Sequence, residues 1–294
     1  MRTFENTSYL SPVSFHRAKA TLVGTRFADL RSVADTGSTN ADMRGLLDAA
    51  ALAGVSVPSP IVLLADHQSA GRGRLDRSWQ APPGSSVLMS IGLPVPTIPP
   101  ERRSLLTSCL ALAVTDATAS LGLDQVQIKW PNDLVVDAPT DGAGAGSGGP
   151  GYRKVGGILA ELHPVAGSGD CLILGIGLNV NWPEIPDELA LLATSLNHVA
   201  GHDIDRDDLV AQILSLLDRV WLPALDAADL APLSEAYVAR SATLGRDVRV
   251  ELPGSELIGR ATRVAADGAL VVVDAAGTEH TVTVGDVVHL RPVL

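Results

Sequence analysis

The stretch Gly71-Arg72-Gly73-Arg74-Leu75-Asp76-Arg77-Ser78-Trp79 joins two apolar runs, 60–65 and 87–93. Both runs have the length and composition of buried strands, so the stretch is predicted to be a loop between two partner strands. It carries three arginines in nine residues, although the net charge of the chain is -11. Glycine lets the backbone approach a ligand, and guanidinium groups bind phosphate oxygens two at a time. The sequence therefore predicts a loop that closes on a phosphate.

The composition narrows the class of protein. A chain of 294 residues with 46% hydrophobic content can form about two domains. The excess of 33 acidic over 22 basic residues and the 3% aromatic content argue against a broad nucleic-acid surface. Cys109 and Cys171 lie far apart, which favours buried thiols in a cytoplasmic protein without disulfides. No leader peptide or membrane span is evident, and no histidine pair suggests a zinc site.

Further elements are predicted around the loop. The triplet Ser38-Thr39-Asn40 precedes helical spacing that stops at Gly54, and residues 101–121 form a long apolar segment typical of a core helix. Residues 126–130 and 134–136 read as a hairpin that turns at Pro131-Asn132-Asp133. Residues 137–153 are rich in glycine and are predicted to be a flexible extension of this hairpin.

The rest of the chain predicts two kinds of structure. Segments 155–162 and 171–180 favour strands, and segments 207–221 and 230–239 favour helices. Beyond residue 243 the pattern changes to short strands separated by turns, at 248–252, 257–264, 270–273 and 281–284. We expect an α+β protein with a mixed sheet and packed helices over 31–242, and an all-β domain over 243–294. Residues 1–30 are an N-terminal extension, too weakly patterned for a winged-helix DNA-binding domain.

Three further groups of residues each allow two interpretations. Lys129, Asn132 and Asp133 form either a hairpin turn or a cluster that offers a cation to phosphate and oxygens to Mg²⁺. Lys154 is either a solvated lysine or an amine placed beside the Gly156-Gly157 backbone. The triplet 38–40 is more typical of a helix cap, although capping leaves polar groups able to meet a ligand.

Taken together, five segments resemble the biotin protein ligase family, in order: 38–40, 68–79, 129–133, 154–159 and 175–179. The resemblance extends from about Thr36 to the C-terminus. It implies a catalytic domain like those of class II aminoacyl-tRNA synthetases, followed by an SH3-like β-barrel. It also implies a monofunctional ligase without an N-terminal DNA-binding domain, active as a monomer or a homodimer, with no DNA or membrane partner.

The resemblance implies a two-step reaction. Biotin and MgATP give biotinyl-5′-AMP and pyrophosphate, and a lysine of a biotin carboxyl carrier protein or domain then attacks the mixed anhydride. Two alternatives stay open: a lipoate-type ligase of the same fold, and a non-catalytic regulator that binds biotinyl-AMP.

The family pattern also implies roles for individual residues. Catalytic roles fall to Lys154, Arg72 and Arg74. The residues implied to contact biotin are Ser38, Thr39, Asn40, Gln68, Gly71, Arg72, Gly73, Arg74, Lys154, Gly157, Gly175 and Gly177. The residues implied to contact ATP are Arg72, Arg74, Arg77, Trp79, Lys129, Asn132, Lys154, Asn179 and Arg206, and Asn132 and Asp133 would assist Mg²⁺ on the phosphates.

Overall fold

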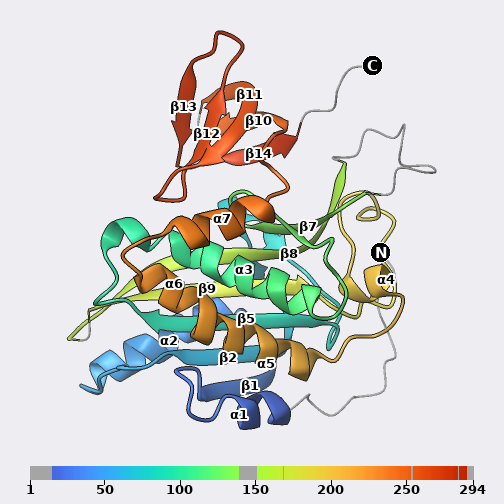
Figure 1. Cartoon of the computed structure of the whole chain (residues 1–294). Helices are drawn as coiled ribbons and strands as arrows, with labels where there is room; N and C mark the ends of the chain where they lie inside the picture. Colours follow the sequence, from blue (N-terminus) through green and yellow to red (C-terminus); the bar gives the residue numbers. More distant parts are fainter. Residues whose placement is uncertain (1–14, 139–150, 168, 253, 284, 290–294) are drawn as a thin grey trace.

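The computed structural model describes residues 15–138, 151–167, 169–252, 254–283 and 285–289, and these form a large mixed sheet with helices and a small all-β unit (Figure 1). The large sheet has the strand order β1-β2-β5-β9-β8-β7-β6. Strands β1 and β2 are parallel, and every other neighbouring pair in this sheet is antiparallel. The strands are β1 (Asp29–Thr36), β2 (Ile61–Gln68), β5 (Ser86–Pro94), β6 (Gln127–Lys129), β7 (Asp133–Asp137), β8 (Tyr152–Val165) and β9 (Gly169–Asn179).

The middle strands are apolar on both sides because helices cover both faces of the sheet. Val62 and Leu64 of β2 belong to the main core, whereas Ile61 and Leu63 pack with Met43 of α2 (Thr39–Leu52). Successive side chains of a strand point to opposite faces. This explains why the run 60–65 is continuously apolar rather than alternating.

The main core lies between the sheet and a group of helices that covers its other face (Figure 1). Its central helix, α3, spans Leu105–Ala119, and a short 3-10 turn occupies the start of the predicted segment 101–121. The predicted helix 207–221 is α5 (Arg206–Leu216) followed by a π-helical turn (Leu217–Trp221). The remaining helices are α4 (Leu196–Ala200), α6 (Leu222–Asp226) and α7 (Ala231–Ala239).

The described end of the N-terminal segment packs into the main core. Phe15, Ala18, Leu22 and Phe27 are buried around the short helix α1 (His16–Thr21). The carboxylate of Asp207 in α5 accepts hydrogen bonds from the backbone N–H groups of residues 17 and 18, at 2.9 and 2.8 Å. A helix end leaves such N–H groups without partners inside the helix, so α5 completes the N-terminus of α1.

The C-terminal unit is a five-stranded antiparallel sheet with the order β13-β12-β11-β10-β14, which agrees with the predicted SH3-like domain. Its last strand was not predicted, because the short run 286–289 does not stand out from the preceding residues. Trp130 of the β6–β7 hairpin joins its core. The strands are β10 (Asp247–Leu252), β11 (Ser255–Val264), β12 (Leu270–Val273), β13 (Glu279–Val282) and β14 (Asp286–His289).

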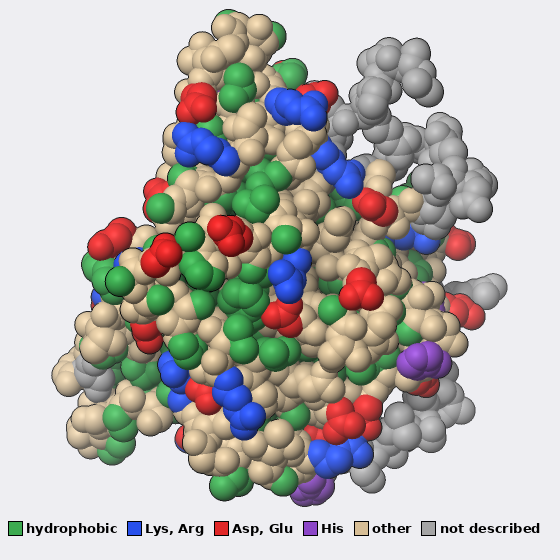
Figure 2. All heavy atoms as spheres, in the orientation of Figure 1, with side chains coloured by type: hydrophobic (Ala, Val, Ile, Leu, Met, Phe, Trp, Pro, Cys, Tyr) green, Lys and Arg blue, Asp and Glu red, His purple; other side chains and the backbone are tan. Residues whose placement is uncertain are grey.

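The predicted extension at 137–153 falls mainly on 139–150, which lie outside the described residues. Its two ends are adjacent, because Asp137 of β7 pairs with Tyr152 of β8. None of the helices in the described ranges is long and apolar enough to cross a membrane. On the face drawn in Figure 2, acidic and basic side chains are interspersed with apolar ones rather than gathered by sign.

Candidate functional site

A cavity of about 340 Å³ opens on the α2 face of the large sheet. It lies beyond the N-terminus of α2, over the first half of β8 and the second half of β9, and the arginine-rich loop 71–79 crosses it. Among the described residues, members of five of the predicted segments and one residue of the C-terminal domain line it. Tertiary folding therefore brings together motifs that are spread over most of the chain.

The polar N-terminus of α2 forms one wall. Ser38 is the N-cap, but its side chain makes no capping hydrogen bond. Gln68 Oε1 accepts hydrogen bonds from the backbone N–H and the hydroxyl of Thr39, at 2.8 and 3.0 Å. Ser90, buried in an otherwise apolar strand, lies within hydrogen-bonding distance of Thr39 Oγ1 and Asn40 Oδ1, at 2.7 and 2.6 Å. These contacts fix the polar wall against the sheet.

Asn40 is also held from the far side of the pocket. Its amide donates to Glu161 Oε2 at 2.7 Å, and Arg44 Nη2 lies 2.9 Å from the other oxygen of the same carboxylate. A side chain fixed by partners on both sides loses little further freedom when a ligand binds. Asn40 was predicted from the sequence to be a site residue, whereas its hydrogen-bond partners Ser90 and Glu161 were not.

Glycines form the floor of the cavity. A Cβ atom added at Gly175 would lie 2.2 Å from Asn40 Oδ1, and one added at Gly177 would lie 2.4 Å from Trp79 Cε2. At Gly157 it would approach Lys154 Nζ to 3.0 Å. At these three positions, neighbouring side chains therefore lie where the Cβ atom of any residue other than glycine would be.

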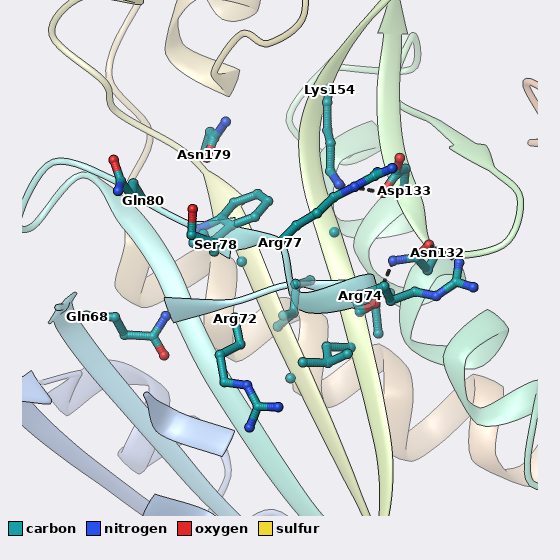
Figure 3. A pocket seen from close by; sticks show the side chains of 18 of the residues that line it. Gln68, Arg72, Arg74, Arg77, Ser78, Gln80, Asn132, Asp133, Lys154 and Asn179 are labelled. Carbon is teal, nitrogen blue, oxygen red and sulfur yellow. Dashed lines mark hydrogen bonds and ion pairs between the residues drawn. The ribbon is translucent and has the colours of Figure 1, made fainter. Parts of the chain in front are cut away.

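The arginine-rich loop is a small hairpin over this floor. Strands β3 (Gly71–Arg72) and β4 (Ser78–Trp79) pair, with a 3-10 turn at Arg74–Asp76 between them. Arg74 donates to Asn132 Oδ1 at 3.0 Å and to the Gly285 carbonyl at 3.2 Å. Arg77 lies 2.6 Å from Asp286 Oδ2. Figure 3 shows Arg72 pointing to the opposite side of the loop from Arg77.

Two buried polar atoms of the pocket have no hydrogen-bond partner among the described residues. They are Trp79 Nε1 and Asn179 Oδ1, whereas Asn179 Nδ2 donates to the Thr194 carbonyl at 3.0 Å. Buried polar atoms are nearly always satisfied in folded proteins. One donor and one acceptor in a cavity wall are thus available to a ligand.

A chain of charges lies beside the loop. The chain contains three lysines, and two of them are here. Lys154 Nζ lies 2.5 Å from Asp133 Oδ1 and 5.6 Å from the centre of the Trp79 ring. Lys129 Nζ lies 3.7 Å from the other oxygen of Asp133. Burial lowers the pKa of Lys129 below its ordinary value, although Asp133 and Asp286 act in the opposite direction. Asp133 thus links an accessible amine with a buried one.

The structure gathers most of the residues named from the sequence. The predicted residues that line the cavity are Ser38, Thr39, Asn40, Gln68, Arg72, Gly73, Arg74, Arg77, Trp79, Asn132, Asp133, Lys154, Gly157, Gly175, Gly177 and Asn179.

Three named residues lie outside this lining: Gly71, Lys129 and Arg206. Gly71 supports the loop, because a Cβ atom there would lie 2.4 Å from the Trp79 carbonyl oxygen. Arg206 is buried and donates to the Ser86 carbonyl and to Asp66, at 2.8 and 2.9 Å. Its guanidinium therefore ties α5 to the sheet, and its predicted place near the adenine stays a prediction.

Other lining residues were missed by sequence reasoning. Trp182, whose indole N–H donates to Ser86 Oγ at 2.9 Å, follows the glycine-containing strand β9 and could have been noticed as an aromatic beside it. Asp286 had no such signal, because it lies more than 200 residues from the loop in sequence and in another domain. The remaining missed residues are Leu75, Ser78, Gln80, Ile158, Leu159, Ile176, Leu189 and Ala193.

The carboxylate and amide oxygens near the loop are the groups of this site that could hold a cation. Within the described ranges, no group of three or more His, Cys, Asp or Glu side chains is arranged to hold a metal. Asp133 is paired with two lysines, and Asn132 Oδ1 accepts from Arg74. These oxygens fit a magnesium ion bound mainly by phosphates, not one held by the protein alone.

Comparison with known sequences agrees with this architecture. The sequence profile of the Biotin/lipoate A/B protein ligase family matches residues 49–179, and that of the Biotin protein ligase C terminal domain matches residues 243–290. The first match begins in the last turn of α2, after the polar wall at 38–40, and covers the arginine-rich loop and the floor of the cavity. The fold and the site thus define a protein of the biotin and lipoate ligase class.

Individual relatives narrow the class. The chain is 35% identical over 271 residues to the biotin–[acetyl-CoA-carboxylase] ligase of Mycobacterium tuberculosis, a match that spans 91% of each protein. It is 30% identical to the bifunctional ligase/repressor BirA of Bacillus subtilis, over 75% of this chain and 64% of that protein. The biotin protein ligase of Aquifex aeolicus, solved in complex with biotin and ATP, superposes with a TM-score of 0.70 at 25% identity, covering 90% of this chain and all of that one. The chain belongs to the biotin protein ligase family.

Proposed function

We propose that this pocket joins biotin to ATP and then passes biotin to a lysine of a biotin carboxyl carrier protein or domain. The observation that carries the proposal is the cavity itself. It combines a fixed polar wall, a glycine floor and a cationic loop in about 340 Å³. Such a cavity suits a small ring with polar edges joined to a phosphate.

The α2 wall is the binding place for the ring of biotin. The groups of Ser38, Thr39 and Asn40 can meet both donors and acceptors of a cyclic urea. Their supports, Gln68 and Ser90, keep them in place before the ligand arrives. The glycines at 157, 175 and 177 leave the ring room to lie against the sheet.

The nucleotide binds at the other end, near Trp79 and Asn179. Trp79 encloses the base, and Asn179 Oδ1, which is buried without a partner among the described residues, accepts a hydrogen bond from it. Arg77 and Lys129 counter the charge of the outer phosphates. Arg72 and Arg74 bind near the carboxylate and the α-phosphate, since guanidinium groups suit both.

In the first step, a biotin carboxylate oxygen attacks the α-phosphorus. The bond between that phosphorus and the oxygen bridging to the β-phosphate breaks, and pyrophosphate leaves. Two anions must approach each other, so the protein contributes by holding them in line and neutralising their charge. Lys154, accessible and held by Asp133, contacts both reacting groups. Magnesium enters with ATP as part of the substrate, where Asn132 and Asp133 can assist.

In the second step, the unprotonated amine of the acceptor lysine attacks the carbonyl carbon of the mixed anhydride. The bond from that carbon to the phosphate oxygen breaks, AMP leaves, and the amine gives up a proton. The loop 71–79 covers the intermediate between the steps, which limits its loss to water.

A carrier-labelling assay tests this function. Purified protein is incubated with MgATP, an apo carrier domain and either biotin or lipoate, and pyrophosphate release and carrier mass are measured. We expect labelling with biotin only. Labelling with lipoate but not with biotin would indicate that the protein is a lipoate ligase. Pyrophosphate release without labelling would indicate a protein that makes and holds the adenylate without transferring it. Absence of both pyrophosphate release and carrier labelling would refute the proposal.

A further inference from the structure

Of the residues of the C-terminal domain that the structure describes, one lines the cavity, and it meets the arginine-rich loop. Asp286 is the first residue of β14, and its Oδ2 lies 2.6 Å from Arg77 Nη2. The neighbouring Gly285 carbonyl accepts a hydrogen bond from Arg74 at 3.2 Å. Two consecutive residues of one domain thus hold two arginines of the loop.

The two partners of this ion pair differ in how much of each side chain is exposed to solvent. The Asp286 side chain is 21% exposed, whereas that of Arg77 is 64% exposed. Partial burial opposes ionisation of Asp286, but the hydrogen bond from Arg77 and the charge of Lys129 outweigh it and lower the pKa of the carboxyl group. A largely buried, ionised carboxylate therefore holds an exposed guanidinium at the edge of the pocket.

The loop needs such contacts to keep its shape. Leu75, between the two arginines, has a φ of 54°, in the left-handed region that costs energy for residues other than glycine. Its side chain is 70% exposed, so packing does not hold it there. The side chains of Arg74 and Arg77 hold the loop tip through hydrogen bonds to Asn132, Gly285 and Asp286.

A carboxylate and a polyphosphate compete for the same guanidinium. Both bind arginine through charge-assisted hydrogen bonds, and like charges side by side repel each other. A pyrophosphate group at Arg77 would lie next to Asp286. Binding of that group therefore weakens the ion pair with Asp286.

We propose that Asp286 is a positioning residue that holds the loop against the C-terminal domain through Arg77, and that a polyphosphate releases the loop by taking its place. The identity of the polyphosphate as the outer part of ATP rests on the proposed function. The loop contact itself does not, so the two can fail separately.

Limited trypsin digestion of the ligand-free protein tests the contact, because trypsin cuts after arginine. Cleavage after Arg74 is followed by mass spectrometry in the wild type and in Asp286→Asn. An exposed ion pair alters such an equilibrium by up to about fivefold, so we expect cleavage to be about two to five times faster in the variant. Arg77→Gln breaks the same ion pair from the loop side and should accelerate cleavage after Arg74 equally. This second variant tests the loop contact if Asp286→Asn does not fold.

Asp137→Asn is the matched control. Asp137 of β7 pairs with Arg246 at 3.1 Å and so also connects the two domains, but it does not contact the loop. This variant should leave cleavage after Arg74 unchanged. Equal acceleration in this control, or none in Asp286→Asn and Arg77→Gln, would overturn the proposal.

The exchanged double variant, Arg77→Asp with Asp286→Arg, separates the loop contact from phosphate binding. We expect slow cleavage to return because the ion pair is rebuilt with reversed charges. Inorganic pyrophosphate, measured by calorimetry, should bind about two to five times more tightly to Asp286→Asn and more weakly to the double variant. Continued rapid cleavage in a folded double variant, or unchanged pyrophosphate affinity in Asp286→Asn, would contradict the proposal.

Discussion

The arginine-rich loop and the β6–β7 hairpin both connect the large sheet with the C-terminal domain, but by different means. The loop uses hydrogen bonds and an ion pair at Gly285 and Asp286. The hairpin inserts Trp130 among the valines and leucines of the C-terminal core, where its indole N–H donates to the Gly268 carbonyl at 3.0 Å. One attachment is polar and partly exposed, and the other is apolar and buried.

This difference separates a permanent connection from an exchangeable one. Removing a buried tryptophan leaves a void that no ligand fills, so the hairpin stays attached as long as the domain is folded. An exposed ion pair can be replaced by another anion at little cost. The site therefore has a stable side, which carries Asn132 and Asp133, and a replaceable side, which carries the arginines.

The largest expected effect on stability comes from disrupting the buried attachment of the β6–β7 hairpin to the C-terminal domain. Trp130→Ala should lower the free energy of unfolding by about 3–5 kcal/mol, because it removes a large side chain from the C-terminal core. Chemical denaturation measures this loss. Trp79→Ala, in the loop, should cost less, since that residue is partly exposed whereas Trp130 is buried. Equal losses in the two variants would contradict the distinction.

Lys154 lies between the two sides, beneath the Trp79 ring and beside Asp133. Lys154→Ala should slow the formation of biotinyl-AMP by on the order of 10²- to 10³-fold, because one preorganised charge contact to the reacting groups is lost. Single-turnover measurements give this rate. Lys19→Ala, on the remote helix α1, is the control, and a wild-type rate in Lys154→Ala would remove Lys154 from the reaction.

Gly177→Ala should disturb the arginine-rich loop and leave the β6–β7 hairpin in place. The added Cβ atom would lie 2.4 Å from the Trp79 ring, so the ring must move. Overpacking of this kind costs about 1–3 kcal/mol, which corresponds to roughly 5- to 150-fold weaker nucleotide binding if the whole cost opposes binding. Calorimetric titration with ATP measures it. Gly45→Ala has free space around it and serves as the control, and full affinity in Gly177→Ala would show that the ring is not part of the nucleotide site.

The smallest effect is expected from Arg74→Gly, which removes the contacts of Arg74 with Asn132 and the Gly285 carbonyl. Release of biotinyl-AMP should become about fivefold faster, as loss of a partly exposed charge-assisted hydrogen bond would cause. Biotin affinity should change less, because the α2 wall is untouched. Unchanged release would argue against the loop as a cover for the intermediate.

Local signals predicted much of the fold. The apolar runs 60–65 and 87–93 are antiparallel neighbours in the large sheet, and the polar triplet 38–40 begins α2, as expected. The short strands after residue 243 form the small antiparallel domain. The strand at 286–289 and the burial of residues 15–27 were not foreseen, because short segments gain their stability from packing rather than from their own pattern.

The chemical groups of the site could be read from the sequence, since arginines, glycines and the Lys-Trp-Pro-Asn-Asp turn are recognisable by type and order. Which of these groups share a cavity depends on tertiary folding. It placed Arg206 in a buried ion pair with Asp66, assigned Trp130 to the C-terminal core, and brought Asp286 to the loop. The physical reason is that charge and size are properties of a residue, whereas burial and pairing depend on contacts between segments far apart in the chain.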